Sequence, residues 1–407
     1  MLKRWLVIFG LLFLSAQNFA QQKFFDVRGK EIIAPGGKVF LMKGTNLGNW
    51  LVPEGYMFKF DKAVSPRLIH DVVAELIGPD KANAFWKKYL QNYITHADIY
   101  YLKTIGVNSL RIPFHYKFFT DEEYMGGSGE QRGFALLDSA VKWCKQEGLY
   151  VILDMHCAPG GQTGDNIDDS WGYPFLYESE ENVQQAISIW KKIAAHYANE
   201  TTVMGYDVLN EPIPHFYDIA KFNPLLEPVY KRIVAGIRQV DKNHIVFLGG
   251  AQWDSNFDVF GPPFDSKLVY TFHKYWTAPT KEVIQSYLDF SNKYNVPLYM
   301  GESGENSDEW ITEFRKTLDS NKVGWDFWPY KKMDDKACFV QFNRPHDYSV
   351  IKEFADTSRS TLEEIRKARP DTKLITEALN MFLENCLYKN CFPNKGYIEA
   401  LGLKHNY

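Results

Sequence analysis

The sequence predicts a single α/β domain: a (β/α)₈ barrel with an N-terminal β-hairpin and a helical C-terminal tail. Short apolar runs alternate with helical patterns in eight successive units, which favours one barrel over two domains. The chain shows no internal repeat and no linker rich in Pro, Gly or Ser. Its 407 residues, 45% of them hydrophobic, suffice for a large core and fit one barrel of this kind.

The elements follow in order along the chain. Residues 24–38 predict a hairpin with Gly36-Gly37 as its turn, which could plug the closed bottom of the barrel. The expected barrel strands are residues 39–46, 108–114, 150–156, 203–212, 245–250, 268–275, 297–304 and 324–330. The expected helices are residues 65–106 in two or three pieces, 134–147, 180–197, 225–240, 281–294 and 308–318, with a mostly helical tail over 349–387.

Two of the strands end in a glutamate. Residues 203–212 read V-M-G-Y-D-V-L-N-E-P, and residues 297–304 read P-L-Y-M-G-E-S-G. The residue before a proline favours extended geometry, so we expect Glu211 at the carboxyl end of its strand, pointing out of the barrel. A cap on the following helix is the alternative role for Glu211. Glu302 lies 91 residues further on, which leaves room for three strand–helix units of about 30 residues each. Paired carboxylates across a barrel mouth are what retaining glycosidases require.

Composition and net charge indicate which kinds of ligand the protein could bind. The net charge of −4 argues against a nucleic-acid partner. Aromatic residues make up 16% of the chain, and although core packing explains most of them, some could be sugar platforms.

The N-terminus resembles a secretory signal. Lys3 and Arg4 precede an apolar run over residues 5–14 that is too short to span a bilayer, and Ala20 offers a cleavage point. We therefore expect residues 1–20 to be a signal peptide and 21–407 to be one secreted or periplasmic domain, monomeric and without stable membrane insertion. A retained anchor helix is the alternative.

The five cysteines show no zinc-ligand spacing. Cys386 and Cys391 are close enough in sequence to bridge in an oxidising compartment. Cys144 lies in a helical pattern and is expected to be a small buried hydrophobe. An odd number leaves at least one free thiol.

Six motifs, in order along the chain, carry a family resemblance: R-I-P-F, L-D-M-H, L-N-E-P, H-K-Y, G-E-S and F-W-P-Y-K. Together they resemble glycoside hydrolase family 5, a family of (β/α)₈ enzymes, over residues 39–332. The pieces G-T-N-L-G-N-W-L-V-P-E and A-P-G-G-Q-T-G-D-N are similar to its exo-β-1,3-glucanase branch. The chain departs from that branch in a longer and more acidic loop, D-N-I-D-D-S-W-G-Y.

The resemblance implies roles for two glutamates and their supports. Glu211 corresponds to the general acid/base and Glu302 to the nucleophile. Arg111 would keep Glu302 ionised and oriented, unless it forms only a rim salt bridge. Tyr275 would donate to the same carboxylate, and Asn210 would bind the sugar 2-hydroxyl.

Three further side chains are expected to line the sugar site. His156 and His273 follow the third and sixth strands, and structural roles are the alternative for both. Trp328 corresponds to the aromatic floor under the reacting sugar. Weaker platform candidates, for which packing is the alternative, are Trp50, Trp171, Trp253 and Trp276.

These patterns predict a retaining β-glycosidase that acts by double displacement on a β-glucan or a derived oligosaccharide, with no metal or organic cofactor. A β-mannan or another β-glycan remains an alternative substrate. A long polar loop over 158–173, with residues 253–264, could wall off one side of the mouth and favour exo-type attack.

Two other classes of protein are alternatives to a retaining β-glycosidase. A non-catalytic carbohydrate-binding barrel would lack a glutamate or its supporting Arg and Tyr, and all of these are present. A metal-dependent hydrolase would need a His/Asp cluster at ligand spacing. The acidic residues 165–169 could bind Ca²⁺ or form a solvated loop.

Overall fold

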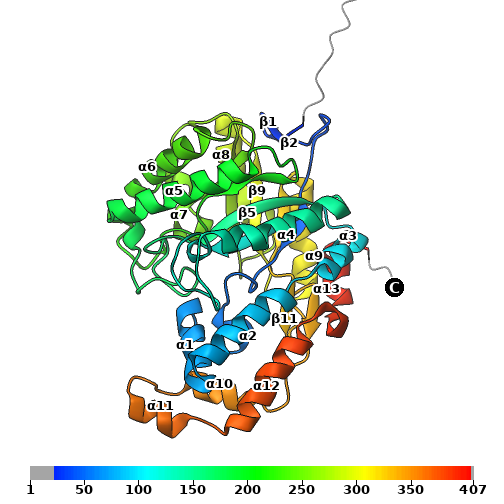
Figure 1. Cartoon of the computed structure of the whole chain (residues 1–407). Helices are drawn as coiled ribbons and strands as arrows, with labels where there is room; N and C mark the ends of the chain where they lie inside the picture. Colours follow the sequence, from blue (N-terminus) through cyan, green and yellow to red (C-terminus); the bar gives the residue numbers. More distant parts are fainter. Residues whose placement is uncertain (1–22, 405–407) are drawn as a thin grey trace, which may run out of the picture.

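The computed structural model describes residues 23–404 and shows a closed eight-stranded parallel barrel (Figure 1). The predicted signal peptide, residues 1–20, lies outside the described residues. The strands in barrel order are β10 (Gly324–Phe327), β3 (Lys43–Asn46), β4 (Ser109–His115), β5 (Tyr150–Cys157), β6 (Val203–Asp207), β7 (Ile245–Gly249), β8 (Leu268–Lys274) and β9 (Leu298–Ser303). The predicted fold class is therefore confirmed.

The barrel strands are buried on both faces. All residues of β4, β6, β7 and β9 are buried, as expected for a parallel sheet covered by helices outside and side chains inside. Glycine permits the closest strand contacts: a Cβ at Gly44 would lie 2.1 Å from the Ser109 carbonyl oxygen.

The N-terminal hairpin pairs β1 (Asp26–Arg28) with β2 (Glu31–Ile33), and its turn is at Gly29, not at Gly36-Gly37 as predicted. The two later glycines form a second turn, which a bridge from Ile33 to Val39 closes. Hairpin residues Phe25 and Ile32 join a buried cluster with barrel side chains, among them Met204, Phe247 and Tyr299. The hairpin thus packs against the amino-terminal end of the barrel.

Helices cover the outside of the barrel. Most begin and end at recognisable signals: α1 starts after the capping side chain of Ser65, and α4 ends at Gly148 in the left-handed conformation. The helices between the strands are α1 (Pro66–Ile77), α2 (Pro79–Asn92), α3 (His96–Ile105), α4 (Gln131–Glu147), α5 (Glu180–Tyr197), α6 (Ile219–Arg238), α8 (Gln285–Tyr294) and α9 (Asp308–Ser320). The short segment α7 (Ala251–Asp254), which follows β7, is not a regular helix, because Gln252 and Trp253 have left-handed backbone angles. Among the described residues, no helix is long and apolar enough to cross a membrane.

Most of the C-terminal tail lies beside α1 and α2, at the bottom of Figure 1, whereas its last helix packs against α9. It contains α10 (Tyr348–Asp356), α11 (Leu362–Ala368), α12 (Thr372–Asn385) and α13 (Lys395–Ala400). A small second sheet, which the sequence did not predict, follows the last barrel strand. It consists of β11 (Lys331–Met333), β12 (Val340–Phe342) and β13 (Phe392–Pro393).

The tail cysteines are free. Cys386 and Cys391 carry free thiols in this structure, as do the other three cysteines. Cys144 is fully buried in α4, as predicted.

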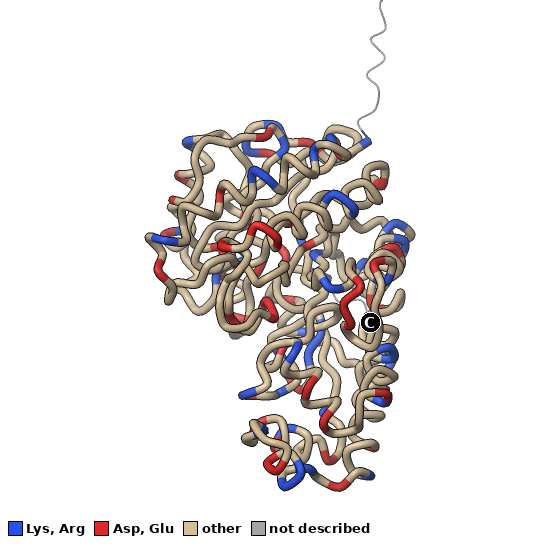
Figure 2. The backbone as a smooth tube through the Cα atoms, turned by 60° about the vertical axis from the view of Figure 1, so that its left-hand side comes forward, with Lys and Arg blue, Asp and Glu red and all other residues tan. Residues whose placement is uncertain are grey.

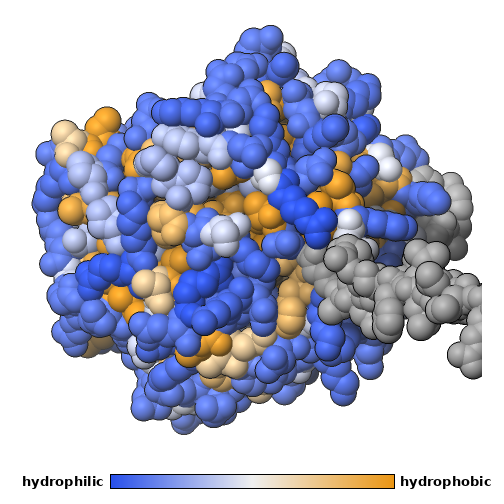
Figure 3. All heavy atoms as spheres, turned by 90° about the horizontal axis from the view of Figure 1, so that it is seen from above, coloured by the Kyte–Doolittle hydropathy of each residue, from blue (hydrophilic) through white to orange (hydrophobic). Residues whose placement is uncertain are grey.

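The surface is mainly polar. Basic and acidic residues are interspersed along the backbone (Figure 2). The face seen from above is largely hydrophilic, with scattered apolar atoms (Figure 3).

A buried lysine fastens the tail to the barrel. The Lys331 ammonium group lies 2.6 Å from Asp98 Oδ1 and donates to the carbonyl oxygens of Tyr93 and Cys386 at 2.6 and 2.9 Å. Both charged side chains are fully buried. One ammonium group therefore joins β11, α3, the end of α2 and the end of α12.

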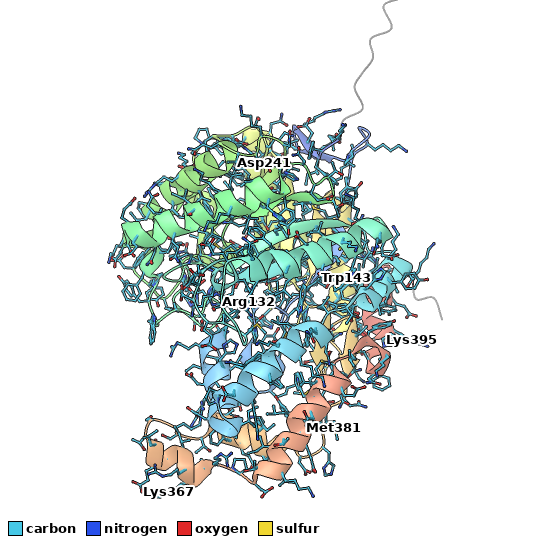
Figure 4. The ribbon with its side chains drawn as sticks, viewed as in Figure 1. Arg132, Trp143, Asp241, Lys367, Met381 and Lys395 are labelled. Carbon is cyan, nitrogen blue, oxygen red and sulfur yellow. The ribbon has the colours of Figure 1, made fainter. Side chains whose placement is uncertain are left out.

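We expect Lys331→Met to lower the free energy of unfolding by about 3–5 kcal/mol, because Asp98 would keep a buried charge without its partner. Urea denaturation of the purified chain measures this loss. Lys367 lies on the far end of α11 and its ion pair with Glu363 is exposed (Figure 4), so Lys367→Met is the control that should leave stability nearly unchanged. Equal stabilities of the two variants would contradict the assignment.

Candidate active site

Polar side chains from several barrel strands converge at the mouth, where the carboxyl ends of the strands meet. They surround a pocket of about 720 Å³. The residues that line it are Glu54, Tyr56, His156, Asp165, Asn166, Ile167, Glu211, Trp253, Ser255, His273, Tyr275, Trp276, Glu302, Glu305 and Trp328.

Arg111 lies at the base of this site and is completely buried. Its guanidinium group donates to Asp207 Oδ2 at 2.8 Å, Asn46 Oδ1 at 3.0 Å, Asn210 Oδ1 at 2.8 Å and Glu302 Oε1 at 2.5 Å. Arg111 therefore does not form a salt bridge at the rim, which was the alternative, and its predicted contact with Glu302 is present.

Glu302 ends β9 and accepts hydrogen bonds on both carboxylate oxygens. Arg111 donates to Oε1, and the Tyr275 hydroxyl donates to Oε2 at 3.1 Å. His273 Nδ1 lies 3.7 Å from Oε2. Burial raises the pKa of Glu302 above the ordinary value, while the positive charge of Arg111 opposes that rise. The two donors favour the ionised form.

Glu211 follows β6 in an unexpected backbone conformation. Its φ of 44° is left-handed, so the extended geometry predicted from the following proline is wrong. The local preference is overridden by tertiary hydrogen bonds: Thr163 Oγ1 donates to the Glu211 carbonyl oxygen at 2.8 Å, and the Glu211 N–H donates to Asp254 Oδ2 at 3.3 Å. Burial raises the pKa of Glu211 to about 7.

The two glutamates face each other. One carboxylate oxygen of Glu211, one of Glu302 and one ring nitrogen of His273 lie within 4.8 Å of one another. Carboxyl groups about 5–5.5 Å apart characterise retaining glycosidases, whereas inverting enzymes need a wider gap for water. These three groups could also hold a cation, but Arg111 and Tyr275 already occupy Glu302.

Asn210 and His156 lie beside the glutamates and are buried. Arg111 donates to the Asn210 side-chain oxygen, and the Asn210 amide nitrogen lies 3.4 Å from His156 Nε2. His156 Nδ1 lies 2.7 Å from Asp154 Oδ2, and burial lowers the pKa of this histidine to about 4. A neutral imidazole is therefore present at neutral pH.

Trp328 forms one wall of the pocket. Its ring is parallel to that of His156, with centroids 5.6 Å apart, and its Nε1 donates to the Tyr56 hydroxyl at 2.7 Å. A Cβ at Gly48 would approach the Trp328 ring to 2.5 Å, so glycine is needed behind it. The structure therefore brings all eight predicted site residues together.

The weaker tryptophan candidates divide. Trp253 and Trp276 line the pocket. Trp50 is a core residue that donates to the Leu90 carbonyl oxygen. Trp171 is 75% exposed and does not line the pocket; it stacks under the guanidinium group of Arg67.

Two carboxylates of the acidic loop are buried and accept backbone hydrogen bonds. Asp168 is buried and accepts from the backbone N–H groups of Thr163, Gly164 and Ser170. Asp169 accepts from the Arg67 N–H group. These carboxylates therefore hold the loop in shape, while Asp165 lines the pocket.

Sequence reasoning missed several pocket residues. Glu54 is the last residue of the motif G-T-N-L-G-N-W-L-V-P-E and lines the pocket, although the motif predicted no role for it. Asp254, which does not line the pocket, lies in residues 253–264, which were predicted only to form a wall. Glu305 accepts from Tyr56 at 3.0 Å and from Lys332 at 2.7 Å. A carboxylate soon after a strand end was the available signal for Glu305.

Known proteins are similar to this chain in sequence or in fold. A β-xylosidase of Phanerodontia chrysosporium is 30% identical over 239 residues, or 58% of this chain and 48% of that protein. A probable glucan 1,3-β-glucosidase A of Aspergillus fumigatus is 30% identical over 215 residues, or 51% of this chain and 49% of that protein. The chain thus spans about half the length of these curated relatives.

The solved structure of an endogalactoceramidase shares the fold, with a TM-score of 0.61 at 17% sequence identity. The superposed region covers 93% of this chain and 84% of the endogalactoceramidase chain. The family model described as cellulase, glycosyl hydrolase family 5, matches residues 75–334. Because that match spans more than half of the chain, the protein belongs to glycoside hydrolase family 5.

Proposed function

We propose that this protein is a retaining β-glycosidase that hydrolyses β-linked oligosaccharides. The observation that carries the proposal is the pair of facing carboxyl groups, Glu211 and Glu302, with oxygens within 4.8 Å in a pocket at the barrel mouth. Their surroundings differ in the sense that double displacement needs, since Glu302 is held by Arg111 and Tyr275 whereas burial raises the pKa of Glu211 to about 7.

In the first step, the Glu302 carboxylate attacks the anomeric carbon while Glu211 protonates the departing oxygen. A glycosyl ester on Glu302 forms and the glycosidic bond breaks. In the second step, Glu211 takes a proton from water, which attacks the ester and releases the sugar with its configuration retained. The Asn210 amide would donate to the 2-hydroxyl, and Trp328 would lie against the sugar face.

Substitution of each glutamate should distinguish the nucleophile from the acid/base. Glu302→Ala should be inactive on natural glycans and on activated aryl glycosides alike, because the covalent step is lost. Glu211→Ala should lose of order 10²–10⁴-fold on unactivated glycosides, yet still be glycosylated by an aryl glycoside with an acidic phenol. Added azide should then speed its slow deglycosylation and give the β-glycosyl azide, seen by NMR.

Other results would exclude this assignment. Full activity of Glu211→Ala on unactivated glycans, or a β-configured azide from Glu302→Ala, would reverse or reject the roles. An inverted first product from the unmodified enzyme would reject the retaining mechanism.

The catalytic rate should depend on the protonation states of both glutamates. Glu211 must be protonated for glycosylation, so kcat/KM on unactivated glycosides should fall as the pH rises through about 7. Glu302 must be ionised, and because burial raises its pKa, the acid limb should lie above that of a free carboxyl group. Initial rates between pH 4 and 9 test both limbs, and Glu211→Gln should remove the alkaline one. A profile that is flat above neutrality would contradict the role of Glu211.

The substrate we propose is a β-glucan or an oligosaccharide derived from one, and a β-mannan or other β-glycan is the alternative. The relatives named as a β-xylosidase and a probable glucan 1,3-β-glucosidase support a β-linked substrate. Residues 165–167 and Trp253 line the pocket, which supports the proposed wall on one side and exo-type attack.

Exo-type attack would give characteristic products from a polymer. The enzyme should release mono- or disaccharides from chain ends with little loss of polymer viscosity, because internal bonds cannot enter a walled pocket. Viscometry and product chromatography on the same β-glucan digest measure both quantities. Rapid viscosity loss with few reducing ends would show endo-type attack instead.

We also propose export after cleavage near Ala20, supported by the charged start and the short apolar run of the sequence. The mature protein should then begin at Gln21 by intact mass. A mass that still includes Met1 would reject cleavage.

A further inference from the structure

Two consecutive loops at the barrel mouth are held in left-handed backbone conformations. After β6, Glu211 and Ile213 have φ values of 44° and 54°. After β7, Gln252, Trp253 and Asp254 have φ values of 51°, 57° and 56°. Residues other than glycine rarely adopt this region, least of all a β-branched one, and such clusters persist only where surrounding contacts determine them.

The two loops fasten each other. The Gln252 N–H donates to the Ile213 carbonyl oxygen at 2.7 Å, and the Gln252 side chain donates to the same oxygen at 3.3 Å. The Trp253 N–H donates to the Pro212 carbonyl oxygen at 3.4 Å. The backbone that carries Glu211 is thus attached to the segment that carries Asp254.

Asp254 lies beneath the pocket and is completely buried. Its Oδ2 accepts the Glu211 N–H at 3.3 Å and lies 3.3 Å from His273 Nε2. Glycine is required next to it, because a Cβ at Gly249 would lie 1.8 Å from Asp254 Oδ1. The site is therefore shaped around this carboxyl group, although it does not line the pocket.

His273 links Asp254 to the predicted acid/base. Its Nδ1 lies 2.9 Å from Glu211 Oε1, while Nε2 faces Asp254. Burial lowers the pKa of this histidine to about 3, so the ring is neutral and carries one hydrogen. Whichever nitrogen faces the stronger acceptor carries that hydrogen, so the group opposite Nε2 decides what Nδ1 presents to Glu211.

We propose that Asp254 is a positioning residue for proton transfer by Glu211, acting by holding the Glu211 backbone and by fixing the tautomer of His273. The proposal rests on the proposed function, because it assumes that Glu211 is the acid/base. Asp254 makes no contact with the reacting sugar. Its effect is to keep the Glu211 carboxyl group aimed at the glycosidic oxygen and in a defined hydrogen bond with His273.

The test compares two β-glycosides of the same sugar. One has a poor leaving group that needs a proton, such as a methyl or alkyl aglycone, and the other releases 2,4-dinitrophenolate, which needs none. Asp254→Ala should lose about 10–100-fold in kcat/KM on the first substrate and only a few-fold on the second, because a misplaced acid penalises the step that requires it. Asp254→Asn keeps an acceptor oxygen and should recover most of the loss.

The ratio of the two kcat/KM values does not depend on the fraction of folded enzyme, so poor folding of Asp254→Ala would not hide the result. Asp258→Asn makes the matched change at an exposed position four residues further on, and its ratio should equal that of the unmodified enzyme. An equal loss on both substrates would assign Asp254 a purely structural role and overturn the proposal. Absence of hydrolysis by the unmodified enzyme would instead refute the proposed function.

Discussion

The site depends on the burial of a single guanidinium group. Arg111 is fully shielded from water, so its charge must be balanced by nearby acceptors. Asn46 of β3, Asp154 of β5, Asp207 of β6 and Glu302 of β9 supply them, at 2.5–3.1 Å. Side chains from four barrel strands thus take their positions from one group on a fifth strand, β4.

The buried carboxyl groups around this one cation differ in their hydrogen-bond partners. Burial raises the pKa values of Asp154 and Asp207 to about 7, although both contact Arg111. Glu302 is reached by Arg111 directly and also accepts from Tyr275, whereas the side chain of Glu211 contacts a neutral imidazole. Burial raises the pKa of both glutamates, but only Glu302 has Arg111 and Tyr275 as donors that favour its ionised form, as a nucleophile beside an acid requires.

The sequence predicted the parts of this arrangement that local patterns encode. Apolar runs marked the strands, and each strand end placed its polar residue at the mouth, so Glu211 and Glu302 could be located before their contacts were known. The conformation of Glu211 could not be predicted, because the bond from its N–H to Asp254 joins residues 43 positions apart. The sheet of β11, β12 and β13 was missed for a similar reason, since strands of two or three residues carry too little pattern to detect.

The C-terminal tail belongs to the site as well as to the fold, and β11 shows why. Successive side chains of a strand point in opposite directions. Lys331 therefore reaches the buried junction with Asp98, while Lys332 reaches Glu305 in the pocket wall, at 2.7 Å. Glu305 in turn accepts from Tyr56, which accepts from Trp328 in the pocket wall. Docking of the tail and orientation of that tryptophan are thus connected through two adjacent lysines, so a change that loosens the tail should also disturb the pocket.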